Sequence, residues 1–128
     1  MTGPSKLPDY ATYTVGVGGF VYDPATNKVL VVKEKTGPIK NIWKLPGGSV
    51  EAGEELSTAV VREVLEETGV KCEFVSLLCL RQSPGVFGRN NLYAVALLKP
   101  ETTVIKIQED EIEQAKWMDV CHVTSRYD

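Results

Sequence analysis

Three glutamates crowd one short stretch of the sequence, which reads REVLEETG. Glu63, Glu66 and Glu67 are spaced i, i+3 and i+4, so on a helix they share an arc of roughly 100°. Residues 51–70 contain no lysine, and the neighbouring Arg62 is expected to point away from Glu63. Uncompensated carboxylates at this spacing destabilise a helix by a few tenths of a kcal/mol per pair. A bound Mg²⁺ removes this repulsion, so the spacing favours a metal site, with a solvated acidic face as the alternative.

The glutamates belong to a longer pattern that begins at Gly48 and reads GSVEAGEELSTAVVREVLEETGV. Five residues separate Gly48 from Glu54, and seven more separate Glu54 from Arg62 and Glu63. The remaining defined positions are Val64, Glu66, Glu67, Gly69 and Val70. The pattern resembles the Nudix box, GX5EX7REUXEEXGU with U aliphatic, and every defined position is filled. Seven fixed letters at fixed spacings make this resemblance specific.

The resemblance implies a fold, a reaction and a set of site residues. The implied fold is an α/β/α sandwich with a mixed sheet, in which the box forms a loop–helix–loop. The implied reaction is hydrolysis of a nucleoside diphosphate linked to another moiety, with Mg²⁺ or Mn²⁺ as cofactor. The implied metal ligands are Glu63, Glu66, Glu67 and the Gly48 carbonyl. Glu54 and Arg62 would fix the loop against the helix, a role that suits a bidentate arginine–carboxylate pair.

A carboxylate must also accept a proton from the attacking water. Glu66 and Glu67 are candidates within the box. In many Nudix enzymes this base comes from a later loop, and the stretch QEDEIEQ supplies acidic residues there. Glu111 is the preferred candidate of that stretch, whose other acidic residues are Glu109, Asp110 and Glu113. Simple solvation of the loop is the alternative for each of them.

Three residues outside the box are predicted to contact the substrate: Lys44, Arg81 and Phe87. Arg81 ends an expected strand beside the loop SPGVFGRN, where a guanidinium suits a phosphate or a ribose. Phe87 lies in that loop and offers an aromatic face to a nucleobase, although packing is the commoner role of such a residue.

Further stretches of the chain, among them NIWKLPGG and AKWMD, are similar to one Nudix subgroup. This subgroup contains plant ADP-ribose/NADH pyrophosphatases and the animal Nudix protein encoded antisense to a fibroblast growth factor. ADP-ribose or NADH is therefore the expected type of substrate, cut to a nucleoside monophosphate and a phosphorylated product. The alternatives are nucleoside triphosphates, dinucleoside polyphosphates or coenzyme A, or a non-catalytic nucleotide-binding regulatory domain.

The elements that position these residues can be read from local patterns. Residues 54–68 lack Gly and Pro and are bracketed by Gly53 and Gly69, which predicts a helix. Its expected buried face comprises Ser57, Val60, Val61, Val64 and Leu65. Strands are expected at 13–23, 28–35, 42–45, 70–82, 91–99 and 115–120, the first two forming a hairpin. Strands with one intervening helix indicate an α/β or α+β sandwich.

The 128 residues suit one domain. We expect a flexible leader over 1–9 and a Nudix domain over 10–128, as a fragment of a longer protein that ends before a C-terminal helix.

The net charge of −3 argues against a nucleic-acid partner, and no apolar run is long enough for a bilayer. Three cysteines without a CxxC pair suggest a reducing compartment. We expect a cytoplasmic protein, or an organellar one if the native chain is longer, and a homodimer is a further prediction.

Overall fold

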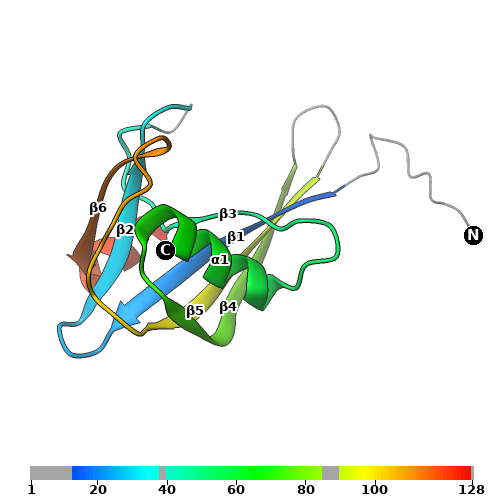
Figure 1. The fold of residues 1–128 in the computed structure, drawn as a ribbon. Coiled ribbons are helices and arrows are strands. Elements are labelled where there is room, and N and C mark those ends of the chain that lie inside the picture. Colours follow the sequence, from blue (N-terminus) through cyan, green and yellow to red (C-terminus); the bar gives the residue numbers. More distant parts are fainter. Residues whose placement is uncertain (1–12, 38–39, 85–89, 128) are drawn as a thin grey trace, which may run out of the picture.

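A computed structural model describes residues 13–37, 40–84 and 90–127 of the chain. The predicted leader over 1–9 lies outside these ranges. Three strands lead to the first helix and three more lead to the second, in an order that Figure 1 follows by colour. The strands are β1 (Tyr13–Asp23), β2 (Lys28–Glu34), β3 (Gly47–Ser49), β4 (Cys72–Pro84), β5 (Asn90–Pro100) and β6 (Ile112–Asp119). The helices are α1 (Leu56–Thr68) and α2 (Val120–Tyr127).

The strands form one mixed sheet with the order β4-β5-β1-β2-β6. β1 and β5 run parallel, whereas the other strand pairs are antiparallel. One edge of β1 is shared by two strands, because β3 pairs with residues 16–18 and β2 pairs with Tyr22 and Asp23. This sharing brings β3, which carries the first residues of the box, against the middle of the sheet.

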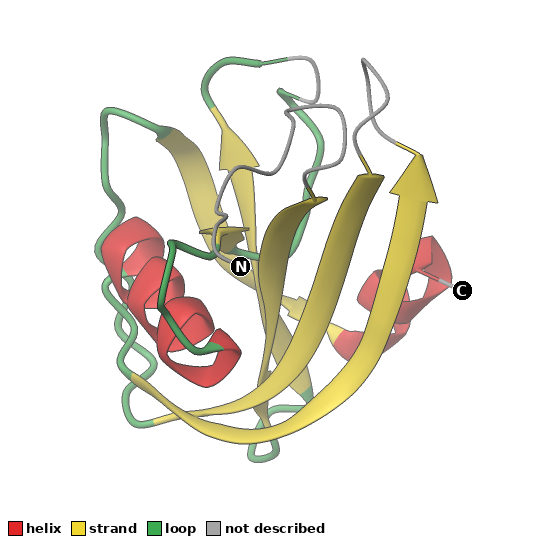
Figure 2. Ribbon diagram, turned by 90° about the vertical axis from the view of Figure 1, so that its right-hand side faces the viewer, coloured by secondary structure: helices red, strands yellow, loops and turns green. Residues whose placement is uncertain are grey.

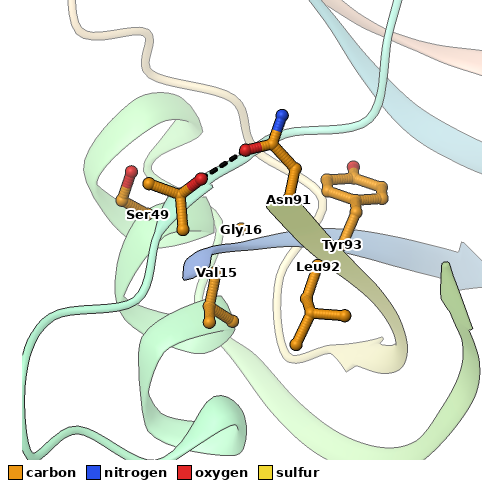
Figure 3. Close-up of a pocket in the computed structure, with 7 residues that line it drawn as sticks. Val15, Gly16, Ser49, Asn91, Leu92 and Tyr93 are labelled. Atoms are coloured by element: carbon orange, nitrogen blue, oxygen red, sulfur yellow. Dashed lines mark hydrogen bonds between the residues drawn. The ribbon is translucent and has the colours of Figure 1, made fainter. Parts of the chain in front are cut away.

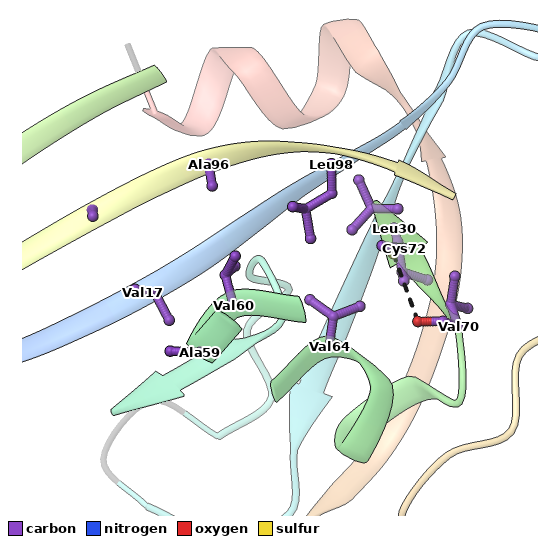
Figure 4. Close-up of a cluster of buried hydrophobic side chains, with 11 residues drawn as sticks. Val17, Leu30, Ala59, Val60, Val64, Val70, Cys72, Ala96 and Leu98 are labelled. Atoms are coloured by element: carbon purple, nitrogen blue, oxygen red, sulfur yellow. Dashed lines mark hydrogen bonds between the residues drawn. The ribbon is translucent and has the colours of Figure 1, made fainter. Parts of the chain in front are cut away.

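One helix covers each face of the sheet, so the domain is an α/β/α sandwich, as predicted (Figure 2). Between α1 and the sheet lies a cluster of buried valine, leucine and alanine side chains that includes Val60, Val64 and Leu98 (Figure 4). On the other face, Val123 of α2 packs against a second cluster that contains Val29 and Val31. The first cluster holds α1 against the sheet.

Helix α1 ends where the sequence predicts and begins two residues later. Gly69 has φ of 73° and donates its backbone N–H to the Leu65 carbonyl at 2.9 Å, which closes the helix. Glu54, expected to open the helix, instead closes a turn, donating its N–H to the Glu51 carbonyl at 3.0 Å. Its carboxylate also accepts the Glu51 N–H, so Glu54 belongs to the loop before the helix.

The buried face of α1 differs from the predicted one. Val60 and Val64 are buried as expected, but Leu65 is 45% exposed. Glu67 continues the stripe of Val60 and Val64 at the helical spacing of three to four residues, and it is only 5% exposed. A glutamate therefore occupies the inward position that the sequence assigns to apolar side chains.

Two other elements differ from the sequence predictions. In place of a strand over 42–45, only Lys44 forms an isolated bridge with Val32, and the true strand is the glycine-rich β3. The segment after the last strand, where no helix was expected, forms α2, and Val123 is buried there. Within the described part of the chain, neither helix is long and apolar enough to cross a membrane.

Candidate functional site

Residues from four separate segments, most of them acidic, line one open pocket of about 560 Å³. The segments are β2 and β3, each with the residues that follow it, helix α1, and the loop that joins β5 to β6. The lining residues are Glu34, Thr36, Gly47, Gly48, Ser49, Glu51, Arg62, Glu63, Glu66, Glu67, Asp110 and Glu111. We call this space the carboxylate pocket. Its wall is dominated by oxygen atoms, which suits cations and the water molecules that surround them.

Arg62 braces the wall of the carboxylate pocket. Its Nε donates to Glu54 Oε2 at 2.7 Å and its Nη2 donates to Glu54 Oε1 at 3.0 Å, a bidentate pair. Nη2 also reaches the Ser49 carbonyl at 3.3 Å. These bonds hold the pKa of Glu54 below its ordinary value and raise the pKa of Arg62. The loop before α1 is thereby tied to the helix and to the end of β3.

The remaining Arg62 nitrogen contacts two glutamates of the box. Nη1 lies 3.2 Å from Glu63 Oε2 and 3.2 Å from Glu66 Oε1. The expectation that Glu63 points away from Arg62 is therefore wrong. The long arginine side chain lies across the turn, so its guanidinium reaches carboxylates one and four residues further along.

Glu67 is the most deeply placed carboxylate of the pocket. Burial raises its pKa to about 7, and the nearby carboxylates of Glu63 and Glu34 add to the effect. The Gly47 N–H, which donates to Glu67 Oε1 at 3.1 Å, and the charge of Lys44 act in the opposite direction. Desolvation outweighs these two stabilising contacts, so the negative charge of Glu67 is incompletely compensated in the protein alone.

Glu63 lies directly against the backbone of Gly48. A Cβ atom at Gly48 would stand 2.5 Å from Glu63 Cδ, so no larger residue fits there without moving the carboxylate. Burial is the main cause that raises the pKa of Glu63, with Glu66 and Glu111 contributing and Arg62 opposing. Glycine is therefore required at position 48 because β3 and α1 approach each other closely there, and not because the chain turns.

Backbone hydrogen bonds position the acidic loop, residues 101–111, at the rim of the pocket. The Gln108 N–H donates to the Glu67 carbonyl at 3.0 Å, near the C-terminal end of α1. The Lys35 N–H donates to the Glu111 carbonyl at 2.9 Å, which ties the loop to the end of β2. These bonds place Asp110 and Glu111 in the lining of the carboxylate pocket.

A second, smaller cavity of about 290 Å³ lies beside the first, at the ends where β1 and β5 begin (Figure 3). Its polar lining includes Thr14, Ser49, Asn91 and Tyr93, and the Thr14 hydroxyl donates to Asn91 Oδ1. The ring of Tyr93 lies over Gly16 and Gly18 of β1, where added Cβ atoms would meet it. Ser49 lines both cavities and so connects them.

Comparison with known proteins accounts for this arrangement. A family model described as the NUDIX domain matches residues 12–127. The chain belongs to the Nudix family. The box in this Nudix chain is therefore the loop–helix–loop formed by β3, the turn at Glu54 and helix α1.

Relatives of this Nudix chain come from animals and plants, as the predicted subgroup requires. The mouse protein "Nucleoside diphosphate-linked moiety X motif 6" is 50% identical over 121 residues, which cover 92% of this chain and 38% of the relative. "Nudix hydrolase 2" of Arabidopsis thaliana is 47% identical over 115 residues, covering 88% of this chain and 41% of the relative. The chain thus spans less than half the length of these two relatives.

Solved structures share the fold. The MutT Nudix hydrolase from Burkholderia pseudomallei superposes with a TM-score of 0.73 at 28% identity, covering 84% of each chain. A UDP-X diphosphatase gives a TM-score of 0.72 at 22% identity, covering 89% of this chain and 54% of the other. The Nudix fold predicted from the box is confirmed by these similarities.

Nudix hydrolases generally use divalent metal ions such as Mg²⁺ or Mn²⁺, and the donor chemistry of the carboxylate pocket fits such ions. Hard dications take oxygen ligands. Burial raises the pKa values of Glu63 and Glu67, so a nearby cation would stabilise their charged forms. Among the residues described, no three acidic, His or Cys side chains already converge as a ligand set. Glu63 and Glu66 face Arg62 Nη1 instead, so a cation would take over the place of that contact.

The three residues predicted to contact the substrate, Lys44, Arg81 and Phe87, differ in their positions relative to the Nudix site. Lys44 forms an ion pair with Glu34 at 2.8 Å, just behind the lining of the carboxylate pocket. Arg81 lies on the exposed strand β4 and lines neither of the two cavities. Phe87 falls outside the described residues. Of the other acidic residues of the QEDEIEQ stretch, Asp110 lines the carboxylate pocket, whereas Glu109 and Glu113 are not in its lining.

The carboxylate pocket is also lined by Glu34, Thr36 and Glu51, which were not predicted from the sequence. A signal for Glu34 exists in the strand, because side chains two residues apart share a face. Leu30 and Val32 lie on one face of β2 and are buried, and Glu34 extends this face at the end of the strand.

Proposed function

We propose that this domain hydrolyses the pyrophosphate bond of a nucleoside diphosphate linked to another moiety, of the ADP-ribose or NADH type. Water adds to one phosphorus and the bridging P–O bond breaks, giving a nucleoside monophosphate and a phosphorylated product. The observation that carries the proposal is that Glu63, Glu66, Glu67 and Glu111 all line one pocket beside Gly48. The name of the mouse relative, which refers to a nucleoside diphosphate-linked moiety, supports this class of substrate.

We propose Mg²⁺ or Mn²⁺ as the cofactor, held by Glu63, Glu66 and Glu67 with the Gly48 carbonyl. When bound, the cation supplies neutralising charge for the pyrophosphate and for the departing phosphate. The protein side chains then have distinct roles. Arg62 fixes the loop through Glu54, and Gly48 leaves room for the Glu63 carboxylate. Glu66, Glu67 and Glu111 are the candidates to accept the proton of the attacking water.

The smaller cavity at Asn91 and Tyr93 is proposed to hold the part of the substrate next to the pyrophosphate. Its volume of about 290 Å³ is at the lower end of the range for small-molecule sites, which suits a sugar-sized group. Hydroxyl and amide groups line it, and these match the hydroxyls of a ribose. Ser49 joins this cavity to the carboxylate pocket, so one substrate can extend into both.

The test is a screen of ADP-ribose, NADH, nucleoside triphosphates, dinucleoside polyphosphates and coenzyme A with Mg²⁺ and with Mn²⁺. We expect the highest turnover on ADP-ribose or NADH, and none after chelation. Glu111→Gln should lower kcat strongly, whereas Glu109→Gln is a matched control, because Glu109 lies in the same loop outside the pocket lining. Equal activity of both variants would remove Glu111 from the mechanism. A lack of turnover on every substrate would favour a nucleotide-binding regulatory role.

We also propose a cytoplasmic location. Cys72 and Cys79 carry free thiols, the first buried and the second exposed. Exposed free thiols are commonest in reducing compartments. Fractionation of the native cells, with this chain detected by antibody, would test the proposal, and recovery in a secreted fraction would contradict it.

A further inference from the structure

Strand β4 presents an exposed apolar surface at the end of the sheet. Among the described strands it pairs only with β5, and it forms the outer edge, on the right in Figure 2. Residues 74–80, which read FVSLLCL, contain no charge, and Val75, Leu77, Leu78 and Leu80 are 48 to 58% exposed. Open edges are normally protected from pairing by charged residues, proline or β-bulges, and this stretch of β4 has two bulges but no charge and no proline.

Two β-bulges align the largest of these side chains on one face. The register of β4 on β5 shifts between Phe74 and Ser76 and again between Leu77 and Cys79. Because of these shifts, every third residue of β4 pairs with a residue of β5 that belongs to the core cluster beneath α1. The pairs are Phe74↔Leu98, Leu77↔Ala96 and Leu80↔Ala94. Residues directly opposite each other share a face of the sheet. Phe74, Leu77 and Leu80 thus form a stripe on the face that carries α1, beyond the area that α1 covers.

Charged residues stand at equal distances on either side of this stripe. Glu73 and Arg81 are each four residues from Leu77. They precede Phe74 and follow Leu80 directly, so both lie on the opposite face of the strand from the stripe. The surface is therefore self-complementary. An antiparallel copy of β4 centred on Leu77 places opposite charges and apolar side chains against each other.

We propose that two copies of this domain associate through their β4 edges, antiparallel about a two-fold axis at Leu77. Phe74 then faces the partner's Leu80, Leu77 faces the partner's Leu77, and Glu73 faces the partner's Arg81. The two sheets become one continuous sheet, and the free backbone groups of each edge strand find partners. Such an isologous contact closes as a dimer and does not extend into a fibre.

A hollow beside Phe74 gives space for the partner's side chains. It measures about 410 Å³ and is lined by Ser57, Thr58, Val61 and Arg62 of α1 together with Phe74. The partner's Leu80, opposite Phe74, enters this hollow and removes apolar surface of α1 from water. The edge offers five exposed large apolar side chains per copy, against about 20 to 30 residues per partner in a standard interface. The dimer is therefore concentration-dependent, and the charge pairs set its register more than its strength.

Analytical ultracentrifugation of the 128-residue chain without substrate tests the proposal independently of the proposed reaction. We expect the mass to rise from 14.1 kDa towards twice that value as the concentration increases from micromolar to about 1 mM. Leu77→Lys should keep the chain monomeric, because two ammonium groups would meet at the axis. Val104→Lys, at a position that is 74% exposed elsewhere, is the matched control and should still dimerise.

A charge exchange tests the antiparallel register. Glu73→Arg and Arg81→Glu should each weaken the dimer about tenfold or less, since exposed ion pairs contribute little. The double variant restores opposite charges across the axis and should recover the original dissociation constant. A chain that stays monomeric at every concentration would overturn the proposal, as would a dimer that tolerates Leu77→Lys. Failure of the double variant to recover would refute this register, even if Leu77→Lys were to disturb folding.

Discussion

The substitution Glu67→Gln probes the electrostatic strain of the carboxylate pocket. Glu67 has a pKa of about 7 in the folded protein against an ordinary value of 4.5. Between these values the folded protein binds the proton more tightly than the unfolded chain, so stability falls as the pH rises from 4.5 to 7. The glutamine side chain of the variant does not titrate, can still accept the Gly47 N–H, and removes this dependence.

The size of the expected stability difference follows from the pKa shift of Glu67. Each unit corresponds to about 1.4 kcal/mol, so ionised Glu67 costs on the order of 3 kcal/mol above pH 7. The Glu67→Gln protein should be more stable than the parent by up to about 3 kcal/mol at pH 8 and almost equal to it at pH 4.5. A difference of this size raises Tm by about 10 °C in a domain of this length.

The assay is urea unfolding followed by circular dichroism, at both pH values and with EDTA present. Glu55→Gln, at an exposed position just before α1, is the control and should show no pH-dependent gain. Adding Mg²⁺ should make the parent more stable than the Glu67→Gln variant, because the cation stabilises only the protein that binds it. A gain of equal size at both pH values, or a loss at pH 8, would refute the assignment of a strained buried charge at Glu67.

Three further substitutions have separate expected outcomes. Gly48→Ala should lower kcat/KM by about 100-fold in a pyrophosphate-hydrolysis assay, because its Cβ displaces the Glu63 carboxylate from the site. Arg62→Lys keeps the charge but loses the bidentate bond to Glu54, so kcat/KM should fall at least about tenfold while circular dichroism stays unchanged. Asn91→Leu should raise KM for ADP-ribose about five- to tenfold with little change in kcat, since one ground-state hydrogen bond is lost.

Much of the site was predictable because its parts are close in sequence. The box spans residues 48–70, and helical spacing alone brings Glu63, Glu66 and Glu67 to one side of α1. Gly69 marks the end of the helix because only a residue that tolerates positive φ closes it there. The hairpin of β1 and β2 follows from a short turn between two apolar strands, and the pairing of Tyr22 with Val29 confirms it.

What the sequence did not predict depends on long-range packing. The helix period placed Glu67 beside the apolar stripe, but only the contact of α1 with β3 shows that its carboxylate is buried. The contact of Arg62 with Glu63 depends on the rotamer of a long side chain, which the spacing does not determine. Glu34 reaches the pocket through the sheet order, and α2 forms where Val123 can cover the second face of the sheet.

The initial rate of AMP release from ADP-ribose, measured across a Mg²⁺ titration, tests the central claim most directly. The carboxylate pocket predicts no rate in EDTA, a rate that saturates with Mg²⁺, and a loss of about 100-fold or more in Glu63→Gln. A rate that persists in EDTA and is unchanged in Glu63→Gln would contradict the claim that these carboxylates carry the reaction.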